Sequence, residues 1–439
     1  MRVKTISRSK DDYLKQKEGD IEKVHHNIDE KYHPFQQQRE YVRALNAVKL
    51  ERVFAKPFIG ALSGHADGVW CTCTNPKSLV QFISGACDGE IRVWDLPTQK
   101  TVFKVQAHRR FVKGLVCDPS GKTFYSCSDD KTIKRYRLAM SVDNLGVKGK
   151  DYNPDPLSVW YGKEGFNYID HSWTDETFVT CSSVVSVWNP DRQEPIHNFS
   201  YETESLLKAR FNPAETGLLA ATSNERGVLL YDIRVSSILR KVQMSMVSND
   251  IAWNPREPMN FTVANEDYNL YTFDMRNLSA PLTTHHDHVG AVLGVAYSST
   301  GREFVSGSYD KTLRIWNVGS ARSREVYHTR RMQRIFCVNF SADGRFVLSG
   351  SDDTNIRIWK AKASAPLYKP TYREESKLEY MDSLKRKYAS FPEISRIARH
   401  RHLPKVIKKM KDKEENRKKK DVKEFNEKEC CVCLETRYI

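Results

Sequence analysis

The sequence has no long hydrophobic runs. No stretch of 18 consecutive apolar residues occurs among its 439 residues, and the start, Met1–Lys4, leads into polar sequence. A membrane-spanning helix needs about 20 mostly apolar residues, and a secretory signal needs an apolar core of roughly 7–15. We therefore expect a soluble protein without a signal peptide and without a membrane partner.

Motifs of catalysis are also missing. We find no nucleophile motif, no glycine-rich phosphate loop and no paired-carboxylate signature. Histidine–aspartate pairs do occur, but they recur at a regular interval, whereas a catalytic constellation is assembled once per protein. The sequence therefore predicts a non-enzymatic protein with no catalytic residues and no cofactor.

The ten cysteines show no disulfide framework. Seven fall mostly within strand-like patterns: Cys71, Cys73, Cys87, Cys117, Cys127, Cys181 and Cys337. Cys430 and Cys433 have C-x-x-C spacing, but only six residues follow, and none of these is His or Cys. Four-ligand zinc coordination cannot be completed from this terminus without a partner chain or distant ligands. We expect reduced thiols in an intracellular compartment, and no metal.

What the sequence does contain is a repeat. Its clearest copy is Glu303–Asn317, where Phe304 and Val305, then Leu313 and Ile315, alternate with polar residues as in two strands joined by a tight turn. The closing aromatics of seven copies are Trp94, Tyr136, Trp188, Tyr231, Phe273, Trp316 and Trp359, separated by 42, 52, 43, 42, 43 and 43 residues. Six residues earlier stand Asp88, Asp130, Ser182, Glu225, Asp267, Asp310 and Asp353. Seven units of this period predict an all-β, seven-bladed propeller.

The repeats resemble the WD-repeat family through Gly64-His65 with Trp94-Asp95, and through His108 and His288. The resemblance implies a buried structural hydrogen-bond network in the blades, made of His65, Asp88, Trp94, His108, Asp130, His288, Asp310, Trp316, Asp353 and Trp359. Serines near these pairs would permit a catalytic interpretation, but their recurrence in each blade favours the structural one.

We expect three regions: an N-terminal extension over residues 1–51 that packs on the propeller, the propeller over 52–361, and a basic helical region over 362–439. Residues 52–61 precede the first Gly-His. We predict that they form a strand that completes the last blade, because a propeller must avoid an exposed sheet edge. The longer interval before Trp188 indicates a surface-loop insertion at residues 139–157.

Helices are expected before and after the propeller in the sequence. Arg39–Leu50 is predicted to be a helix whose apolar stripe comprises Val42, Leu45 and Val48. After the propeller, Thr371 and Glu374 fit a capping box. A helix with an apolar face of Leu378, Met381, Leu384 and Tyr388 would follow and end at Pro392.

The net charge of +15 is concentrated in the tail. Residues 385–423 contain 16 Lys and Arg against 5 Asp and Glu, a net charge of +11, which leaves +4 for the other 400 residues. The predicted contact residues for RNA or another polyanion are Arg396, Arg399, His400, Arg401, His402, Lys405, Lys408 and Lys409. Such a run favours a phosphate backbone, and it is equally compatible with a nuclear or nucleolar localisation signal.

Two repeats end in a shared tetrapeptide pattern: Tyr231-Asp232-Ile233-Arg234 and Phe273-Asp274-Met275-Arg276. They resemble the W-D-x-R box by which WD-repeat substrate receptors dock on the adaptor of cullin-four ubiquitin ligases. The resemblance implies that Asp232, Arg234, Asp274 and Arg276 bind the adaptor. The alternative is a local ion pair of each arginine with its own aspartate.

Longer runs resemble the Sof-type WD-repeat proteins of the small-subunit processome. They include residues 2–9, 50–58, 264–276 and 391–405, and in part 323–329. The resemblance, over residues 2 to about 423, implies a nucleolar scaffold, needed for pre-ribosomal RNA processing and small-subunit assembly. Its partners would be pre-ribosomal RNA, a small nucleolar ribonucleoprotein and assembly proteins, with the chain a monomer within a large complex. The ending Glu429–Ile439 departs from the family's basic terminus.

Cullin-four-associated receptors are similar to this chain too. The alternative function is therefore a substrate receptor of a cullin-four RING ubiquitin ligase. The two functions are compatible in one protein.

Overall fold

The computed structural model describes residues 32–138, 154–200, 205–235, 237–413, 415–417 and 419–420. Contacts divide the chain into two compact units. One contains the described residues 32–51 with 370–398, and the other contains residues 52–369 with those from 399 onward. Most of the insertion expected at 139–157, and the cysteines Cys430 and Cys433, lie outside the described residues.

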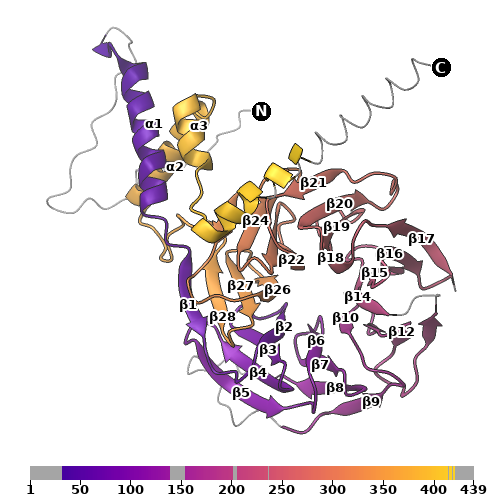
Figure 1. Ribbon diagram of the computed structural model, residues 1–439. Helices are drawn as coiled ribbons and strands as arrows, with labels where there is room; N and C mark the ends of the chain where they lie inside the picture. The colour runs from indigo at the N-terminus through magenta and orange to yellow at the C-terminus, as the bar shows by residue number, and fades with distance from the viewer. Residues whose placement is uncertain are drawn as a thin grey trace, which may run out of the picture. The chain divides into compact units, whose positions relative to one another are not determined.

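The larger unit is a ring of seven four-stranded antiparallel sheets around a central axis (Figure 1). Blade one comprises β2 (Val69–Thr74), β3 (Gln81–Ala86), β4 (Glu90–Asp95) and β5 (Lys100–Gln106). Blade two comprises β6 (Val112–Cys117), β7 (Thr123–Ser128), β8 (Thr132–Arg137) and β9 (Ser158–Tyr161). Blade three comprises β10 (Tyr168–His171), β11 (Phe178–Cys181), β12 (Val185–Trp188) and β13 (His197–Phe199). The predicted all-β, seven-bladed propeller is confirmed.

The remaining blades follow the same order. Blade four comprises β14 (Leu206–Phe211), β15 (Leu218–Ser223), β16 (Gly227–Asp232) and β17 (Ile238–Gln243). Blade five comprises β18 (Ser248–Trp253), β19 (Asn260–Asn265), β20 (Asn269–Asp274) and β21 (Thr283–His286). Blade six comprises β22 (Val292–Tyr297), β23 (Glu303–Ser308), β24 (Leu313–Asn317) and β25 (Glu325–Tyr327). Blade seven comprises β26 (Ile335–Phe340), β27 (Phe346–Ser351), β28 (Ile356–Lys360) and β1 (Phe58–Leu62).

Burial explains the strand patterns. The second strand of a blade is covered on both faces, so every residue of β3 and of β7 is buried. The outermost strand has one neighbour and more solvent, and most of β17 is exposed or half-buried. Period-two alternation is therefore weak in the middle strands and visible mainly toward the outside.

The turn acids act locally on the backbone. The residue after each described turn acid has left-handed backbone geometry: Gly89, Lys131, Arg226, Tyr268, Lys311 and Thr354, with φ between 64° and 87°. In blades one, two, five and six the carboxylate of the turn aspartate accepts the amide two residues on, as in Asp310 Oδ1 with Thr312 N at 2.9 Å. An acid at this position therefore stabilises the turn that a non-glycine residue must make.

The ring is closed by a strand from the start of the chain. β1 pairs antiparallel with β28, with Leu62 opposite Ile356. The closing strand begins at Phe58 rather than at residue 52, because α1 (Gln36–Val53) extends past residue 52 and the non-helical residues 54–57 connect it to the strand. Leu62 is fully buried in a cluster that joins blades seven and one, with Val69, Phe82, Trp94, Leu348, Ile356 and Ile358.

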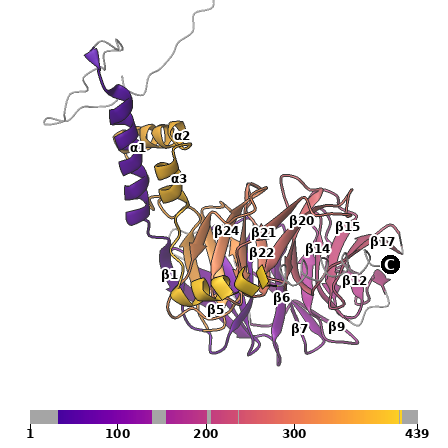
Figure 2. The ribbon, with the colours of Figure 1, turned by 45° about the horizontal axis from the view of Figure 1, so that its top comes forward.

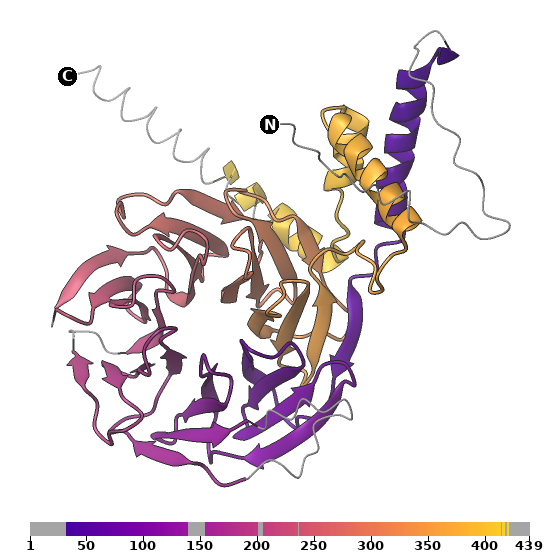
Figure 3. The ribbon, with the colours of Figure 1, turned by 180° about the vertical axis from the view of Figure 1, so that it is seen from behind.

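The smaller unit combines a segment that precedes the propeller in the sequence with a segment that follows it. α1, α2 (Tyr372–Lys387) and α3 (Pro392–Arg399) lie side by side (Figures 1 and 3). Their core comprises Ala44, Val48, Leu384, Tyr388 and Ile394. The Tyr41 hydroxyl donates to Glu393 at 2.7 Å, and Lys385 pairs with Glu51 at 2.7 Å. The two regions expected to be separate extensions thus share one core.

Two details differ from the predicted helices, and one prediction is confirmed. Val42 and Leu378 are about half exposed, because the packed face includes Ala44 in α1 and begins later in α2. Pro392 does not end a helix but begins α3, where its missing amide is tolerated. The capping contact is present, since the Thr371 amide donates to the Glu374 carboxylate at 3.1 Å.

No helix in the described part of the chain is long and apolar enough to cross a membrane. The seven cysteines in described positions are free thiols within the blades.

Blade networks and candidate binding surfaces

Blade six contains the most complete polar network. His288 Nδ1 lies 3.0 Å from Asp310 Oδ2, and its Nε2 lies 2.7 Å from Ser306 Oγ. The Trp316 indole donates to the same Ser306 oxygen at 2.8 Å. Burial lowers the pKa of His288. Burial alone would raise the pKa of Asp310, but His288 and Arg314 hold it below the ordinary range.

Blade two repeats this arrangement with a different closing residue. His108 Nδ1 is 3.0 Å from Asp130 Oδ2, and its Nε2 is 2.8 Å from Ser126 Oγ. The closing aromatic is Tyr136, which is buried against Phe124. Each member of these two networks has a partner, as a buried polar group requires.

The expected His65–Asp88 pair in blade one does not form. His65 Nε2 contacts Ser84 Oγ at 2.6 Å, and the Trp94 indole donates to Ser84 at 2.7 Å, but buried His65 Nδ1 has no partner among the described residues. Asp88 instead accepts the Glu90 amide at 2.9 Å. His65 lies one residue further from its acid than the histidines of blades two and six do.

Blade seven uses arginine in place of histidine. Arg357 binds Asp353 and donates to Ser351 Oγ at 2.8 Å. The Trp359 indole donates to Ser349 at 2.9 Å, so the serine–tryptophan contact is kept. Asp353 therefore belongs to a polar cluster different from that of blade six.

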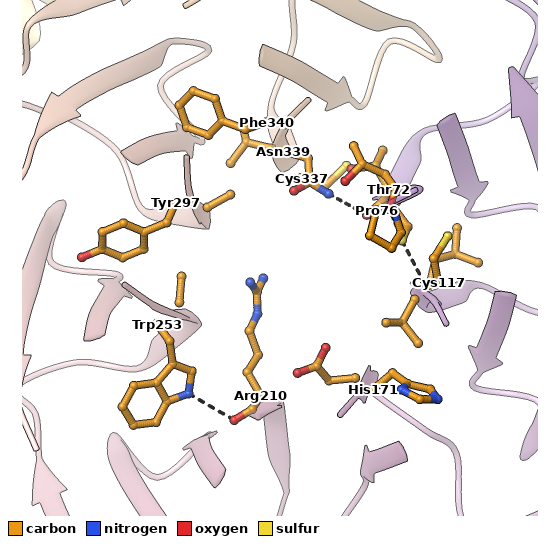
Figure 4. Close-up of a pocket in the computed structure, with 18 of the residues that line it drawn as sticks. Thr72, Pro76, Cys117, His171, Arg210, Trp253, Tyr297, Cys337, Asn339 and Phe340 are labelled. Carbon is orange, nitrogen blue, oxygen red and sulfur yellow. Dashed lines mark hydrogen bonds between the residues drawn. The ribbon is translucent and has the colours of Figure 1, made fainter. Parts of the chain in front are cut away.

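The central channel holds a cavity of about 510 Å³ lined by the innermost strands (Figure 4). Arg210 extends into it, with Nη2 3.3 Å from Asp250 Oδ1, and Lys208 Nζ lies 3.6 Å from the same oxygen. Asp170 lines the same cavity, and burial raises its pKa to about 6. Sequence reasoning missed this cluster, since its members come from the innermost strands of three blades: Asp170 from β10, Lys208 and Arg210 from β14, and Asp250 from β18.

The channel carboxylates connect neighbouring blades. Asp170 Oδ2 accepts the Phe211 amide of the next blade at 2.8 Å. Asp250 Oδ2 accepts the Val295 amide at 2.9 Å, and its Oδ1 accepts the Ile251 amide at 2.9 Å. The bonds to Phe211 and Val295 each link the innermost strands of two neighbouring blades. Within the described ranges, no group of three or more His, Cys, Asp and Glu side chains is arranged to hold a metal ion.

The two arginines of the tetrapeptide pattern lie on adjacent blades and differ in their contacts. Both are exposed. Arg276 binds its own Asp274 with two nitrogens, Nη2 to Oδ2 at 2.9 Å and Nε to Oδ1 at 3.1 Å, as in the local-pair alternative. Arg234 donates its backbone amide to Asp232 at 3.0 Å, and its side chain forms no ion pair with the described residues.

A cavity of about 320 Å³ lies beside Arg276 between blades four and five. It is lined by Leu218, Leu219, Leu230, Leu239, Arg240, Trp253, Met275 and Arg276. Arg240 Nη1 donates to the Arg276 carbonyl at 2.9 Å, which ties β17 to the second tetrapeptide. The surface thus combines an apolar hollow with guanidinium groups.

The tail after α3 docks on the edge of blade six. Asp287 is buried, and three cations approach it: Arg314 at 3.6 Å, Arg401 at 3.4 Å and Lys411 at 3.5 Å. Ser323 donates to it from its amide at 2.9 Å and from its hydroxyl at 2.7 Å. Burial alone would raise the pKa of Asp287, but the cations and these bonds lower it. The helical segment 405–413 lies against the propeller beyond this point (Figure 2).

The predicted RNA-contact residues therefore separate into two sets. Arg401 Nε donates to the Arg324 carbonyl at 3.0 Å, and the His402 ring stacks on that of His328, with ring centres 5.6 Å apart. These two residues hold the tail to the propeller. The exposed cations among the others are Arg396, Arg399, Lys405, Lys408 and Lys409, together with the imidazole of His400.

Replacing Arg401 by glutamate is expected to release the docked segment. Two carboxylates would then face each other at Asp287, and the bond to Arg324 would be lost. Bonds to charged groups contribute about 1.5–3 kcal/mol each, so amide hydrogen exchange of residues 405–413 should accelerate about 10-fold or more. Exchange measured by mass spectrometry on the full chain tests this. Arg399→Glu, at an exposed position, is the matched control, and equal exchange in both variants would contradict the docking role.

Comparison with known proteins identifies two sequence patterns. A Sof1-like domain matches residues 361–431, and the WD domain, G-beta repeat matches residues 56–95, 99–137, 279–317 and 325–360. The four matched repeats cover the three inner strands of blades one, two, six and seven and begin in each case with the outermost strand of the preceding blade, so the match over 279–317 also includes β21 of blade five. The divergent third repeat, without a turn acid, has its strands in blade three.

Curated relatives cover nearly the whole chain. It is 47% identical over 425 residues to "DDB1- and CUL4-associated factor 13" of Danio rerio, covering 96% of this chain and 94% of the relative. Proteins of the same name from Dictyostelium discoideum and Homo sapiens are 48% and 45% identical, each covering 93% of this chain and 90% of the relative. Among solved structures, the WD40 β-propeller domain of Doa1 matches with a TM-score of 0.58 and 19% identity, covering 69% of this chain and 96% of that one, which supports the fold alone.

Proposed function

Because the chain belongs to the WD-repeat family of DDB1- and CUL4-associated factor 13 and carries a Sof1-like domain, we propose that it is a non-catalytic scaffold for assembly of the small ribosomal subunit in the nucleolus. The propeller would hold assembly proteins, and the basic tail would contact pre-ribosomal RNA and its small nucleolar ribonucleoprotein. The observation that carries the proposal is the exposure of Arg396, Arg399, Lys405, Lys408 and Lys409, of which the last four belong to the same unit as the docked anchor at Arg401.

Charge and geometry support RNA as the polyanion. The exposed cations belong to a tail with a net charge of +11, and the anchor keeps those after residue 401 near the propeller. Contacts of lysine and arginine with phosphates release counterions and make binding strongly dependent on salt. They carry no sequence information, so RNA selection would come from shape or from other surfaces.

The test is co-sedimentation with pre-ribosomal particles. Arg399, Lys408 and Lys409 are changed together to glutamate, which removes phosphate contacts without touching the anchor. We expect a marked loss from the particle fractions and from the nucleolus, with the remaining binding less sensitive to salt. The matched control reverses three exposed propeller lysines, Lys77, Lys100 and Lys122. Unchanged sedimentation of the tail variant would contradict its role.

We propose adaptor docking as a second function, since the curated relatives are named for association with DDB1 and CUL4. The supporting observation is that Arg234 and Arg276 are exposed on adjacent blades, beside an apolar hollow. A partner carboxylate would compete with Asp274 for Arg276, and an apolar partner side chain would fill the hollow.

Arg234→Ala combined with Arg276→Ala should abolish co-purification of the ligase adaptor and leave particle co-sedimentation intact. Truncating an arginine at the centre of an interface typically costs about 2 kcal/mol or more. Arg256→Ala with Arg302→Ala, at exposed positions of blades five and six, is the control. Retained adaptor binding in the first variant would exclude these arginines as the docking site.

A further inference from the structure

We propose that one face of the propeller carries a second contact site, which binds single-stranded RNA by base stacking. Its core is a cation–aromatic belt of Trp70, Phe111, Lys113, Tyr309, Arg334 and Phe336, which spans blades two, one, seven and six. The inference rests on the proposed role in RNA-containing particles and adds a site on the propeller itself.

These residues come to one face because of the blade topology. The loop that enters each first strand lies beside the turn between the second and third strands of the same blade. The Tyr309 amide donates to the Ala291 carbonyl at 2.9 Å, and the Asp352 amide donates to the Arg334 carbonyl at 3.0 Å. Entry loops and turns of neighbouring blades therefore share the same end of the ring.

Contacts between blades make the belt continuous. Lys113 Nζ lies 4.9 Å from the Trp70 ring centre and 5.8 Å from that of Phe111. The Trp70 and Phe336 ring centres are 5.0 Å apart, which joins blade one to blade seven. The Arg334 guanidinium lies 4.2 Å from the Tyr309 ring centre, which joins blade seven to blade six.

The belt is accessible. Phe111 is 46% exposed and Tyr309 is 45% exposed, while Trp70 and Phe336 are half-buried. Aromatic rings that cluster on a surface are typical of a binding site, whereas single exposed rings are not. A base can stack on each ring, and the adjacent cation can reach the phosphate that follows.

The surrounding charge favours a polyanion. Exposed cations on the same entry loops and turns are Arg109, Arg110, Lys131, Lys311, Arg330 and Arg331, besides Arg334 of the belt. The exposed acids there are Asp67 and Asp352. The other turn acids are engaged: Asp130 and Asp310 bind histidines, Asp353 binds Arg357, Asp129 pairs with Arg110, and Asp88 accepts the Glu90 amide.

Aromatic rings alternating with cations indicate a single strand rather than a duplex. Paired bases remain inside the helix and cannot stack on side chains, whereas unpaired bases can. Stacking platforms beside cations are typical of proteins that bind single strands with little sequence preference. A purely phosphate-binding surface would not need the four rings.

The experiment measures fluorescence anisotropy of a labelled 20-nucleotide single-stranded RNA with the full chain. The aromatic variant is Phe111→Ala with Tyr309→Ala, and we expect it to weaken binding about 5-fold or more per lost stacking contact. Its control is Trp173→Ala with Tyr368→Ala, two exposed aromatics outside the belt. Arg331→Glu with Arg334→Glu should also weaken binding and reduce its salt dependence, by about 0.7 in slope per lost phosphate contact.

Competitors decide the class of ligand. Unlabelled single-stranded RNA should displace the probe far better than duplex RNA or polyglutamate. Equal displacement by polyglutamate would point to an acidic protein partner, and equal displacement by duplex RNA would point to phosphate contacts alone; either overturns the inference.

The two proposals fail in different ways. If the aromatic and arginine variants of the belt bind like the wild type while Arg399/Lys408/Lys409→Glu does not, the belt inference fails and the proposed scaffold function stands. If the wild-type chain binds no single-stranded RNA and is absent from pre-ribosomal particles, the proposed function fails as well.

Discussion

Replacing Asp310 by alanine is expected to lower the free energy of unfolding by about 3–5 kcal/mol, because it removes several hydrogen bonds to a buried carboxylate, each worth about 1.5–3 kcal/mol. Asp310 contacts His288 at 3.0 Å, and it accepts the Thr312 amide at 2.9 Å and the Thr312 hydroxyl at 2.6 Å. Without it, His288 Nδ1 would be buried with no acceptor. Urea unfolding followed by tryptophan fluorescence measures the change. Trp316 is a local reporter, because it and His288 both form a hydrogen bond with Ser306.

Asp88→Ala is the matched control at the equivalent position of blade one. Asp88 makes a turn contact with the Glu90 amide and none with His65, so its loss should cost only about 0.5–1.5 kcal/mol, the value of one hydrogen bond. The two aspartates occupy the same place in their repeats. A similar large loss in both variants would mean that the turn contact, and not the histidine network, stabilises the blades.

Leu62→Ala is expected to destabilise the propeller by about 2–5 kcal/mol, as for other fully buried leucines. Leu62 is fully buried at the junction of blades seven and one, on the strand that closes the ring. The cavity would lie next to Trp94 and Phe82, which are buried in the same cluster. Equilibrium unfolding in urea should show a lower midpoint, with fluorescence and circular dichroism changing together.

Leu79→Ala provides the control, because this leucine is 56% exposed on a loop of blade one. A surface truncation of this kind should change the free energy of unfolding by no more than about 0.5 kcal/mol. If Leu62→Ala behaved like Leu79→Ala, ring closure by β1 would contribute little to stability.

The basic tail shows how structure changes the meaning of a charge pattern. Arg399 and Arg401 are two residues apart in one cationic run, and the composition does not distinguish between them. Arg399 is exposed, whereas Arg401 binds Asp287 and the Arg324 carbonyl. Reversing Arg401 therefore tests docking, and reversing Arg399 tests contact with a polyanion.

The repeat pattern predicted the propeller, its seven blades and its turn geometry, because these depend on short-range chemistry. A turn acid bonds an amide two residues away, and each blade repeats the same order of four antiparallel strands. The closing strand was expected from the need to cover a sheet edge, though α1 delays its start to Phe58. The family was recognisable from long runs within the helical and blade-five segments.

The contacts that no sequence pattern predicted join partners distant in sequence. The central-channel contacts of Asp170 and Asp250 reach amides about 40 residues away, and no local pattern marks them. The shared core of α1, α2 and α3 joins residues more than 300 positions apart, such as Tyr41 and Glu393.

The sequence by itself determined the fold, the family and the location of the basic charge, since periodicity and composition are properties of the chain. Only the tertiary structure decided which charges are available for binding. Arg234 has no ion-pair partner among the described residues, whereas Arg276 forms an ion pair with Asp274 and Arg401 forms one with Asp287. Availability depends on which groups lie within a few ångströms, and the packing of distant segments sets those distances.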